Sequence, residues 1–437
     1  MPISEPLAWY GALAGLFIAI FLILKKTNPV YSLFLGAIIG SFIGGGSLEQ
    51  TISLLTSGTQ SVMGTVIRVL AAGVLAGVMM ESGAAETIAQ AIVKRMGESK
   101  AIISLALATM IITAVGVFIP VAVLIVAPIA LSVGNKIGIS KIALLLALSG
   151  GGKAGNIISP NPNAIAAANG FHINLSDVMI AGFIPALCGL LMTVLVASLL
   201  RNKGINVSDA EAAAAYGKGN ASGDKQYPTL GKAVVAPLLA VILLMVNPIG
   251  SIFHLSALTA FKLDAMYVLP VAGFVGLLAM GKKEKMLAYT TSGLEKMTAT
   301  VLILIGAGAI AGLIAASDLS TQVVQLIDMM GISGTFLAPI SGILMAGATA
   351  STSTGVILAT STFGHTITNI GMAPIASAVM VHTGATVIDS LPQGNYFHVT
   401  AQSMNMSIRQ RMALLPYEAM VGGTMTLVAT LLYGFAR

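Results

Sequence analysis

The stretch Ser149–Gly170 reads SGGGKAGNIISPNPNAIAAANG and follows the apolar run IALLLAL, where a membrane-spanning helix should continue. It contains three consecutive glycines, a lysine, two prolines and several asparagines. Inside a helix, glycine costs about 1 kcal/mol and proline about 3 kcal/mol relative to alanine. The stretch therefore predicts a membrane helix that is broken within the bilayer.

The composition is that of a membrane protein. The chain has 437 residues, of which 56% are hydrophobic and 9% charged, and its mean hydropathy is +0.93. A soluble domain carries roughly 25% charged residues, and apolar runs of about 17–25 residues indicate spanning helices. We therefore expect an all-α polytopic membrane protein. Its net charge of +6 comes from cations that flank spans and calls for no nucleic acid, and the single cysteine, Cys188, excludes a disulfide and a cysteine metal cluster.

Clusters of lysine and arginine predict the topology, because such clusters favour the cytoplasm. They lie at Lys25–Lys26, Lys94–Lys100, Lys136–Lys141, Arg201–Lys232, Lys282–Lys285 and Arg409–Arg411. With all of them inside, the N-terminus lies outside and the first span runs inward. The stretch Ala101–Val133 then enters and returns to the same side, as a re-entrant hairpin with Gly116 and Pro120 at its turn. We expect a multi-pass protein of the bacterial inner membrane.

Two stretches match at a fixed separation, TVIRVLAAGVLAGVMMESG from Thr65 and ATVLILIGAGAIAGLIAASD from Ala299. By the charge argument the first copy enters from outside and the second from inside, which predicts an inverted repeat, as in many secondary transporters. The expected domains are N-terminal scaffold helices in 1–63, repeat I in 64–200, a cytoplasmic linker in 201–232, further scaffold helices in 233–297, and repeat II in 298–437. Each repeat would hold one hairpin and one broken helix.

The broken helices are the expected substrate site. Unwound backbone at membrane depth is tolerated only beside protein or a water-filled cavity, and paired breaks mark binding sites in transporters. A half-helix that begins near Asn163 would direct its positive end at a carboxylate. The expected substrate-binding residues come from the first break, the hairpin turn ATASTSTG and the second break: Gly151, Gly152, Lys153, Asn156, Ser159, Asn161, Asn163, Ser351, Thr352, Ser353, Thr354, Thr383 and Ser390.

Asp389 and His382 are the expected coupling residues. Asp389 is the acid of the second break, and an ionisable residue within the membrane is a functional candidate by default. Its charged form is disfavoured at membrane depth, whereas a nearby Lys153 ammonium would favour it. This competition would suit a group that takes up and releases the coupling proton.

These motifs resemble the gluconate permease family, the gluconate:proton symporters of the ion transporter superfamily. The resemblance rests on GGGKAGNIISPNPNAIAAA, the hairpin tip GATASTST and the pair Asp389-Ser390. It implies transport of gluconate, related sugar acids or small hydroxy-carboxylates. It also implies an elevator mechanism, in which a dimeric scaffold supports a mobile domain with two re-entrant hairpins, and it implies no cofactor.

The chain departs from the family pattern at four positions. Pro120 stands where the first hairpin usually has an aspartate, and Gly155, Asn161 and Thr386 replace histidines. Proton coupling follows from the resemblance alone, and sodium coupling stays open because unwound carbonyls and hydroxyls suit that ion. The alternatives are a sodium-coupled carboxylate symporter or a sodium/proton exchanger of the same superfamily. A membrane-embedded enzyme is disfavoured, because the chain has no H-E-x-x-H and no G-x-S-x-G motif.

Overall fold

The computed structural model is helical throughout the part of the chain that it describes. That part comprises residues 6–97, 100–213, 227–252, 263–319, 334–392 and 394–435, with residues 255, 258, 321, 322, 325 and 329. Within these ranges, β-structure is limited to two isolated bridges, Leu7 with Ser317 and Ser140 with Asn206. Six described helices are long and apolar enough to cross a membrane, or seven if one bent pair counts as a single span.

The helices of the two halves follow one another in a similar order. Those of the first half are α1 (Trp9–Leu24), α2 (Pro29–Ile43), α3 (Leu48–Ser61), α4 (Met63–Glu81), α5 (Ala84–Met96), α6 (Ala101–Ala114), α7 (Ile119–Ile137), α8 (Lys141–Ile157), α9 (Pro162–Gly170), α10 (Leu175–Ala181) and α11 (Phe183–Leu199). Those of the second half are α13 (Leu230–Ala233), α14 (Val235–Ile252), α16 (Ala265–Ala279), α17 (Met286–Ala315), α19 (Leu337–Thr349), α20 (Thr352–Asn369), α21 (Pro374–Gly384), α22 (Asn395–Ser403), α23 (Ile408–Met412) and α24 (Leu415–Ala429). Three short elements complete them: η2 (Lys283–Lys285), η3 (Gly334–Phe336) and η4 (Thr430–Gly434).

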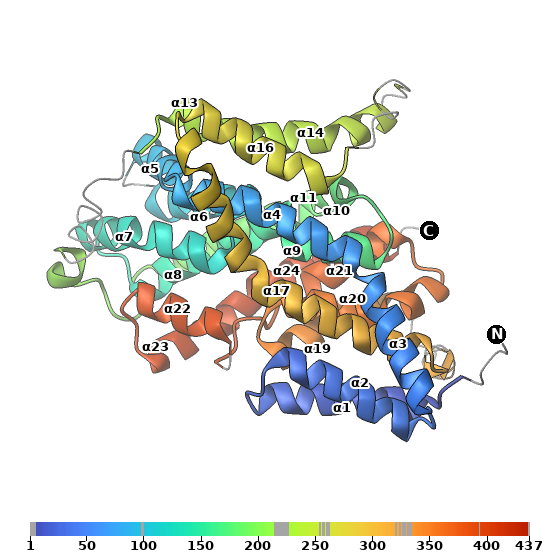
Figure 1. Cartoon of the computed structure of the whole chain (residues 1–437). Helices are drawn as coiled ribbons and strands as arrows, with labels where there is room; N and C mark the ends of the chain where they lie inside the picture. The colour runs from blue at the N-terminus through green and yellow to red at the C-terminus, as the bar shows by residue number, and fades with distance from the viewer. Residues whose placement is uncertain are drawn as a thin grey trace.

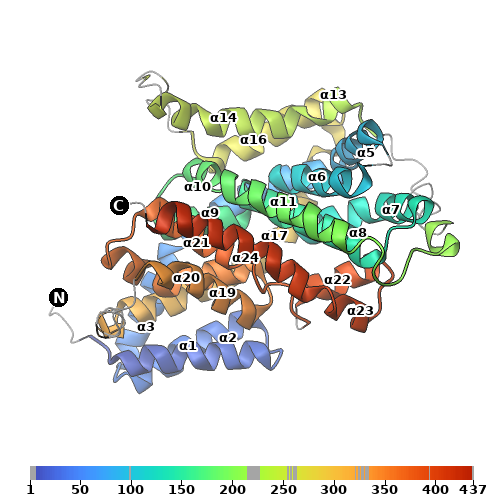
Figure 2. The ribbon, with the colours of Figure 1, turned by 180° about the vertical axis from the view of Figure 1, so that it is seen from behind.

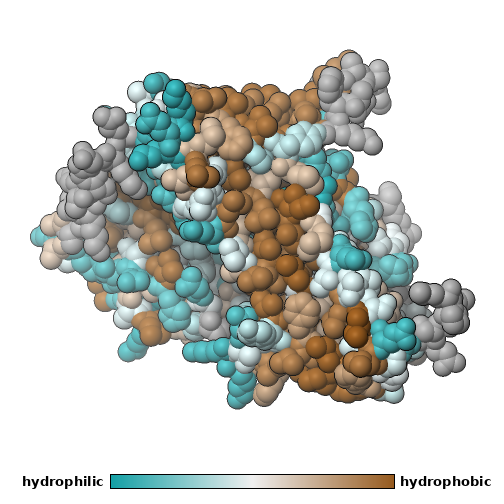
Figure 3. All heavy atoms as spheres, viewed as in Figure 1, coloured by the Kyte–Doolittle hydropathy of each residue, from teal (hydrophilic) through white to brown (hydrophobic). Residues whose placement is uncertain are grey.

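Two helix pairs lie on opposite sides of the molecule. The α1–α2 pair lies at the bottom of Figure 1 and the α14–α16 pair at the top, with α4 and α17 between them. The hairpin and broken-helix elements lie between these two pairs, and in Figure 2 α11 and α24 run across the front of them. Apolar side chains cover the middle of the face in Figure 3, between hydrophilic left and right edges. This pattern fits a membrane protein whose long helices run roughly from one edge to the other.

Close glycine contacts hold α17 against α3 and α4. Gly293 of α17 lies against Gly73 and Gly77 of α4, and Gly308 and Gly312 of α17 lie against Gly58 of α3. At each of these glycines an added Cβ would collide with the partner helix. Small residues of this kind let membrane helices approach closely. The repeat register aligns Gly73 with Gly308 and Gly77 with Gly312, so the two contacts involve equivalent glycines of the two halves.

Both expected hairpins are present as pairs of packed helices. In the first, α6 and α7 pack together and are joined by residues 115–118, with Gly116 at a φ of 102°. In the second, α19 and α20 are joined at Ala350 and Ser351, and Ala350 has a φ of 49°. Pro120 lies in the first turn of α7, where its missing N–H breaks no helical hydrogen bond. Each hairpin therefore turns where the sequence predicted.

The first break lies later in the chain than the glycine run. The break lies within the predicted stretch Ser149–Gly170, but Gly150–Gly152 do not form it, because α8 continues through them to Ile157. The glycines serve packing instead: a Cβ at Gly151 or Gly155 would collide with the backbone of α6, and Thr113 Oγ1 donates to Gly152 O at 3.0 Å.

The helix is interrupted at residues 158–161. Pro160 and Pro162 lack the N–H that a continuing helix needs, so α9 begins at Pro162 with Asn161 as its cap. The second break is longer. Helix α21 ends at Gly384, and α22 begins at Asn395. The segment between them contains Asp389 and Ser390.

The order of elements repeats along the chain. The corresponding pairs are α4 with α17, α6 with α19, α7 with α20, α8 with α21, α9 with α22, α10 with α23, and α11 with α24. Residues with positive φ recur at a nearly constant separation: Gly45 with Gly281, Gly116 with Ala350, Gly138 with Gly371, and His172 with Asn405. The backbone therefore repeats its turns as well as its helices.

The two ends of the predicted linker contact different helices. Lys141 at the start of α8 forms an ion pair with Glu211, whereas Thr87 Oγ1 of α5 donates to Pro228 O at 3.1 Å. Burial raises the pKa of the Glu211 carboxyl, but hydrogen bonds from Lys141 and Ser208 outweigh burial and lower it. The N-terminal end of the linker thus contacts α8, the first part of a broken helix, and its C-terminal end contacts α5.

Candidate functional site

A buried ion pair joins the two breaks. Lys153 lies one turn before the end of α8, and its Nζ is 2.6 Å from Asp389 Oδ1 and 2.5 Å from the backbone oxygen of Thr386. Lys153 is fully buried, and Asp389 is 3% exposed. Ser390 Oγ also donates to Asp389 Oδ1, at 2.8 Å. The sequence placed Lys153 and Asp389 in different halves of the protein, and the fold brings them into direct contact.

The second hairpin adds two contacts to this centre. Thr352 Oγ1 donates to Asp389 Oδ2 at 2.5 Å, and Ser353 Oγ donates to Asn163 Oδ1 at 2.5 Å. Ser351 instead caps α20, because its hydroxyl accepts from the N–H of Thr354 at 3.3 Å and from the Thr354 hydroxyl at 3.2 Å. Asp389 thus accepts hydrogen bonds on both carboxylate oxygens.

The asparagines of the first break bond mainly to one another and to the backbone. Asn161 Nδ2 donates to Asn156 O at 2.8 Å, and Asn161 Oδ1 accepts from the N–H groups of Asn163 and Ala164. The half-helix that we expected to present free N–H groups is therefore capped by Asn161. Two polar atoms here are buried without a partner, Asn156 Nδ2 and Ser159 Oγ. Such groups in a native structure call for an explanation, and a ligand supplies one.

His382 and Thr383 lie at the end of α21. His382 is fully buried, and neither ring nitrogen has a hydrogen-bond partner. Thr383 is also buried, but its hydroxyl donates to Val379 O of its own helix at 2.8 Å. Gly151 and Gly152 contact the first hairpin, as described above. Of these residues, His382 is the one whose side chain has unused hydrogen-bonding capacity.

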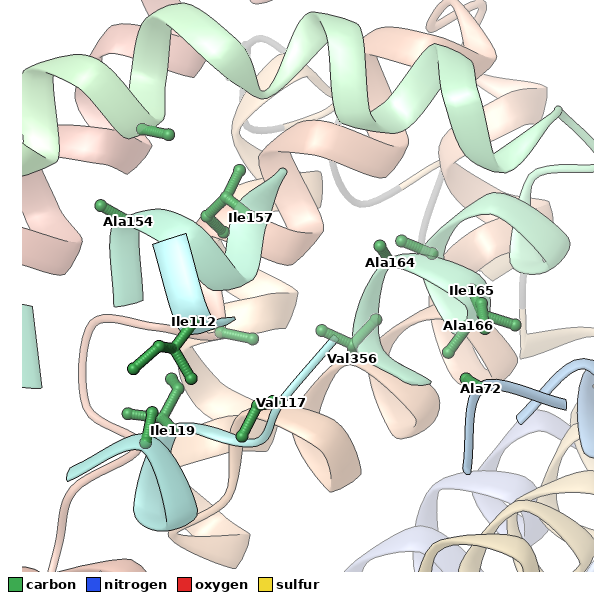
Figure 4. Packing of buried hydrophobic residues seen from close by; sticks show 14 of the residues in the cluster. Ala72, Ile112, Val117, Ile119, Ala154, Ile157, Ala164, Ile165, Ala166 and Val356 are labelled. Carbon is green, nitrogen blue, oxygen red and sulfur yellow. The ribbon is translucent and has the colours of Figure 1, made fainter. Parts of the chain in front are cut away.

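Buried apolar side chains from both hairpins and from both parts of the first broken helix belong to one cluster. Figure 4 shows Ile112, Val117 and Ile119 of the first hairpin lying near Ile157 at the end of α8, with Val356 of the second hairpin between Val117 and Ala164. All of these side chains are buried. An environment of low polarity strengthens the interaction between Lys153 and Asp389 and makes an unpaired charge costly.

A cavity of about 700 Å³ lies beside the centre, between α3, α4 and α17 on one side and α9 and α20 on the other. Its polar lining carries hydroxyls, side-chain amides and imidazoles: Gln50, Ser53, Ser57, Ser61, Thr65, Asn169, His172, Thr360, Ser361, His365 and Thr368. It reaches Ala166 and Ile357, each about one helical turn from the hydrogen-bonded pair Asn163 and Ser353. The volume is in the range of small-molecule sites. The cavity thus approaches the first break and the second hairpin to within about one helical turn along α9 and α20.

A second buried ion pair was missed by sequence reasoning. Arg411 and Glu418 are both fully buried, and they form two hydrogen bonds of 2.7 and 3.1 Å. Arg411 belongs to the predicted cytoplasmic cation cluster, yet its side chain is buried: its Nε donates to Thr400 Oγ1, and its guanidinium lies over the Phe397 ring. The signal was an acid within an apolar segment, seven residues after an arginine. Asp389 is therefore not the only acid buried near the second break.

Comparisons with known proteins agree with this architecture. The uncharacterized transporter of Haemophilus influenzae is 48% identical over 424 residues, which cover 97% of each chain. The gluconate permease of Zymomonas mobilis is 24% identical over 96% of each chain, and the D-serine transporter of Escherichia coli K12 is 23% identical over 94% of each chain.

Two further matches concern the fold and the family. The structure of the YdaH transporter of Alcanivorax borkumensis has a TM-score of 0.69 at 16% identity, covering 89% of this chain and 90% of that one, and at this identity the likeness shows a shared fold. A family model described as GntP family permease matches residues 7–436. The predicted resemblance is thereby confirmed, and the chain belongs to the GntP family of permeases.

Proposed function

We propose that the chain is a symporter that imports a small organic anion, such as a sugar acid or a hydroxy-carboxylate, together with a proton. The observation that carries this proposal is the buried pair of Lys153 and Asp389, which joins the two helix breaks beside unpartnered polar groups. Gluconate and D-serine, named in two relatives, both bear a carboxylate and a hydroxyl. The transported molecule would be a solute of this class.

The first break would hold the carboxylate. Asn156 Nδ2 and Ser159 Oγ are buried donors without partners, and a carboxylate oxygen is the acceptor that each of them lacks. The positive end of α9 lies at the same place, which favours an anion. Ser353 and Asn163, which bond to each other here, would present their polar groups to a substrate hydroxyl.

The mobile domain would consist of the hairpins and broken helices of repeat I (64–200) and repeat II (298–437), related by an inverted topology. The cavity separates α9 and α20 from α3, α4 and α17, so this boundary is where the mobile part would slide past the scaffold. We expect the scaffold helices in 1–63 and 233–297 to form a homodimer.

Uptake by the purified protein in proteoliposomes tests the function. Radiolabelled D-gluconate and D-serine are offered with an imposed inward proton gradient, an inward sodium gradient, or neither. The proposal expects accumulation of at least one organic anion with the proton gradient. Accumulation that requires sodium and ignores pH would contradict proton coupling, and a lack of uptake across a panel of sugar acids, hydroxy-acids and dicarboxylates would contradict the transport of organic anions.

Replacing Asn163 by alanine should weaken substrate binding. The variant removes one neutral hydrogen-bonding group from the first break, which is worth about 0.5–1.5 kcal/mol, or roughly a two- to tenfold rise in KM. Asn161→Ala should raise KM as well, but it also removes the cap of α9, so its stability must be compared with that of wild type. Ser403→Ala, at the far end of α22, serves as the control. Unchanged KM in both asparagine variants would exclude the first break as the binding site.

Labelling of single cysteines tests the topology. In a Cys188→Ala background, Gln50→Cys and Thr368→Cys should react with a membrane-impermeant maleimide added to intact cells, because both positions line the cavity that we place on the outer side. Lys94→Cys and Lys283→Cys should react only after the membrane is opened. The reverse pattern would place the N-terminus inside and invert both repeats.

A further inference from the structure

The ammonium of Lys153 lies among oxygen atoms that would suit a metal cation. It contacts Asp389 Oδ1 at 2.6 Å and Thr386 O at 2.5 Å, and both acceptors belong to the unwound segment after α21. The Asp389 carboxylate also accepts from Ser390 and Thr352, which places two hydroxyl oxygens at the same point. In transporters, unwound carbonyls and hard oxygen donors of this kind coordinate sodium.

The lysine reaches this place from the other half of the protein. Lys153 is on α8, 236 residues from Asp389, and its side chain is fully buried. A buried ammonium is costly unless it is paired, and this one neutralises a buried carboxylate. A monovalent metal ion bound to the same oxygens would supply the same single positive charge.

We propose that Lys153 is a tethered cation, which occupies a latent sodium site formed by Asp389 and the unwound backbone at Thr386. A covalently attached charge cannot be released on the other side of the membrane, so this site contributes no coupling sodium. The inference deepens the proposed function, since it assigns the coupling to protons. Its binding test, however, does not depend on the identity of the substrate.

Thermal unfolding of purified variants in detergent tests the inference. Wild type, Lys153→Ala, Lys153→Arg and the double variant Lys153→Ala/Asp389→Asn are compared in NaCl and in choline chloride at equal ionic strength. Lys153→Ala vacates the site and leaves the carboxylate unpaired, so sodium should raise its Tm in a saturable manner. Wild type, Lys153→Arg and the double variant should have the same Tm in both salts.

The possible outcomes are distinct. A Tm of folded Lys153→Ala that is equal in the two salts overturns the proposal, as does a sodium-dependent rise of the same size in wild type. If Lys153→Ala cannot be purified, Lys153→Ser replaces it, because serine adds one oxygen donor. Failure of both variants to fold even in NaCl also overturns the proposal, since sodium should restore the missing charge. If wild type shows no uptake of any organic anion, the proposed transport is refuted, whereas the result of this sodium test still stands.

Discussion

Asp389→Asn is expected to abolish the accumulation of substrate against a gradient while leaving the exchange of substrate for substrate. Asparagine keeps the shape of the side chain but cannot bind and release a proton at neutral pH. In the structure the carboxylate accepts hydrogen bonds from Lys153, Ser390 and Thr352. Net symport would require this group to gain a proton in one step of the cycle. During exchange the carrier crosses the membrane with substrate bound in both directions. Exchange therefore needs no net proton movement.

Proteoliposomes measure both modes on the same preparation. Accumulation is followed under an imposed pH gradient, and exchange is followed with equal substrate inside and outside. Ser403→Ala serves as the control, because the Ser403 hydroxyl donates to Thr400 O within α22 and leaves the hydrogen bonds of Asp389 in place. If Asp389→Asn still concentrates substrate when only a pH gradient is imposed, the proton is carried elsewhere. If it loses both modes while remaining folded, Asp389 is needed for substrate binding rather than for coupling alone.

Much of the fold could be predicted because the residues that determine its turns and helix breaks act locally. Gly116, with its positive φ, lies at the turn of the first hairpin, and Pro160 and Pro162 lack the N–H groups that would continue α8. The cations at Lys100 and Lys136 indicate that one stretch begins and ends on the same side. Each of these signals depends on a few neighbouring residues, and the sequence displays them directly.

The predictions failed or stayed incomplete where packing decides. The glycines 150–152 are poor helix formers, yet α8 passes through them, and their missing side chains let α11, α6 and α7 approach closely. The N–H groups of α9 were expected to be free, yet Asn161 caps them. The sequence marked Lys153 and Asp389 as candidates, but contact between residues so far apart in the chain could only be suggested by the repeat register. The cavity lined by α3 and α20 had no sequence signal at all.

The contact between Arg411 and Glu418 also depends on packing that the sequence does not display. This ion pair has a large consequence for stability. The guanidinium donates two hydrogen bonds to the carboxylate of Glu418 on α24 and one to Thr400 on α22. It also lies 5.1 Å from the centre of the Phe397 ring, a distance at which cations are attracted to aromatic faces. These contacts fix α22, the half-helix that follows the second break, against α24.

Replacing Glu418 by alanine is therefore expected to destabilise the protein by about 3–5 kcal/mol, because it leaves the buried charge of Arg411 without a partner. The double variant Arg411→Met/Glu418→Leu should recover most of this loss, since apolar side chains of similar volume often replace a buried pair at little cost. Thermal unfolding in detergent, read by the fluorescence of the single tryptophan or of a thiol dye on Cys188, compares the three proteins. A Glu418→Ala variant as stable as wild type would mean that water reaches Arg411. A double variant that is stable but inactive would show that the pair positions α22 for transport as well as holding it in place.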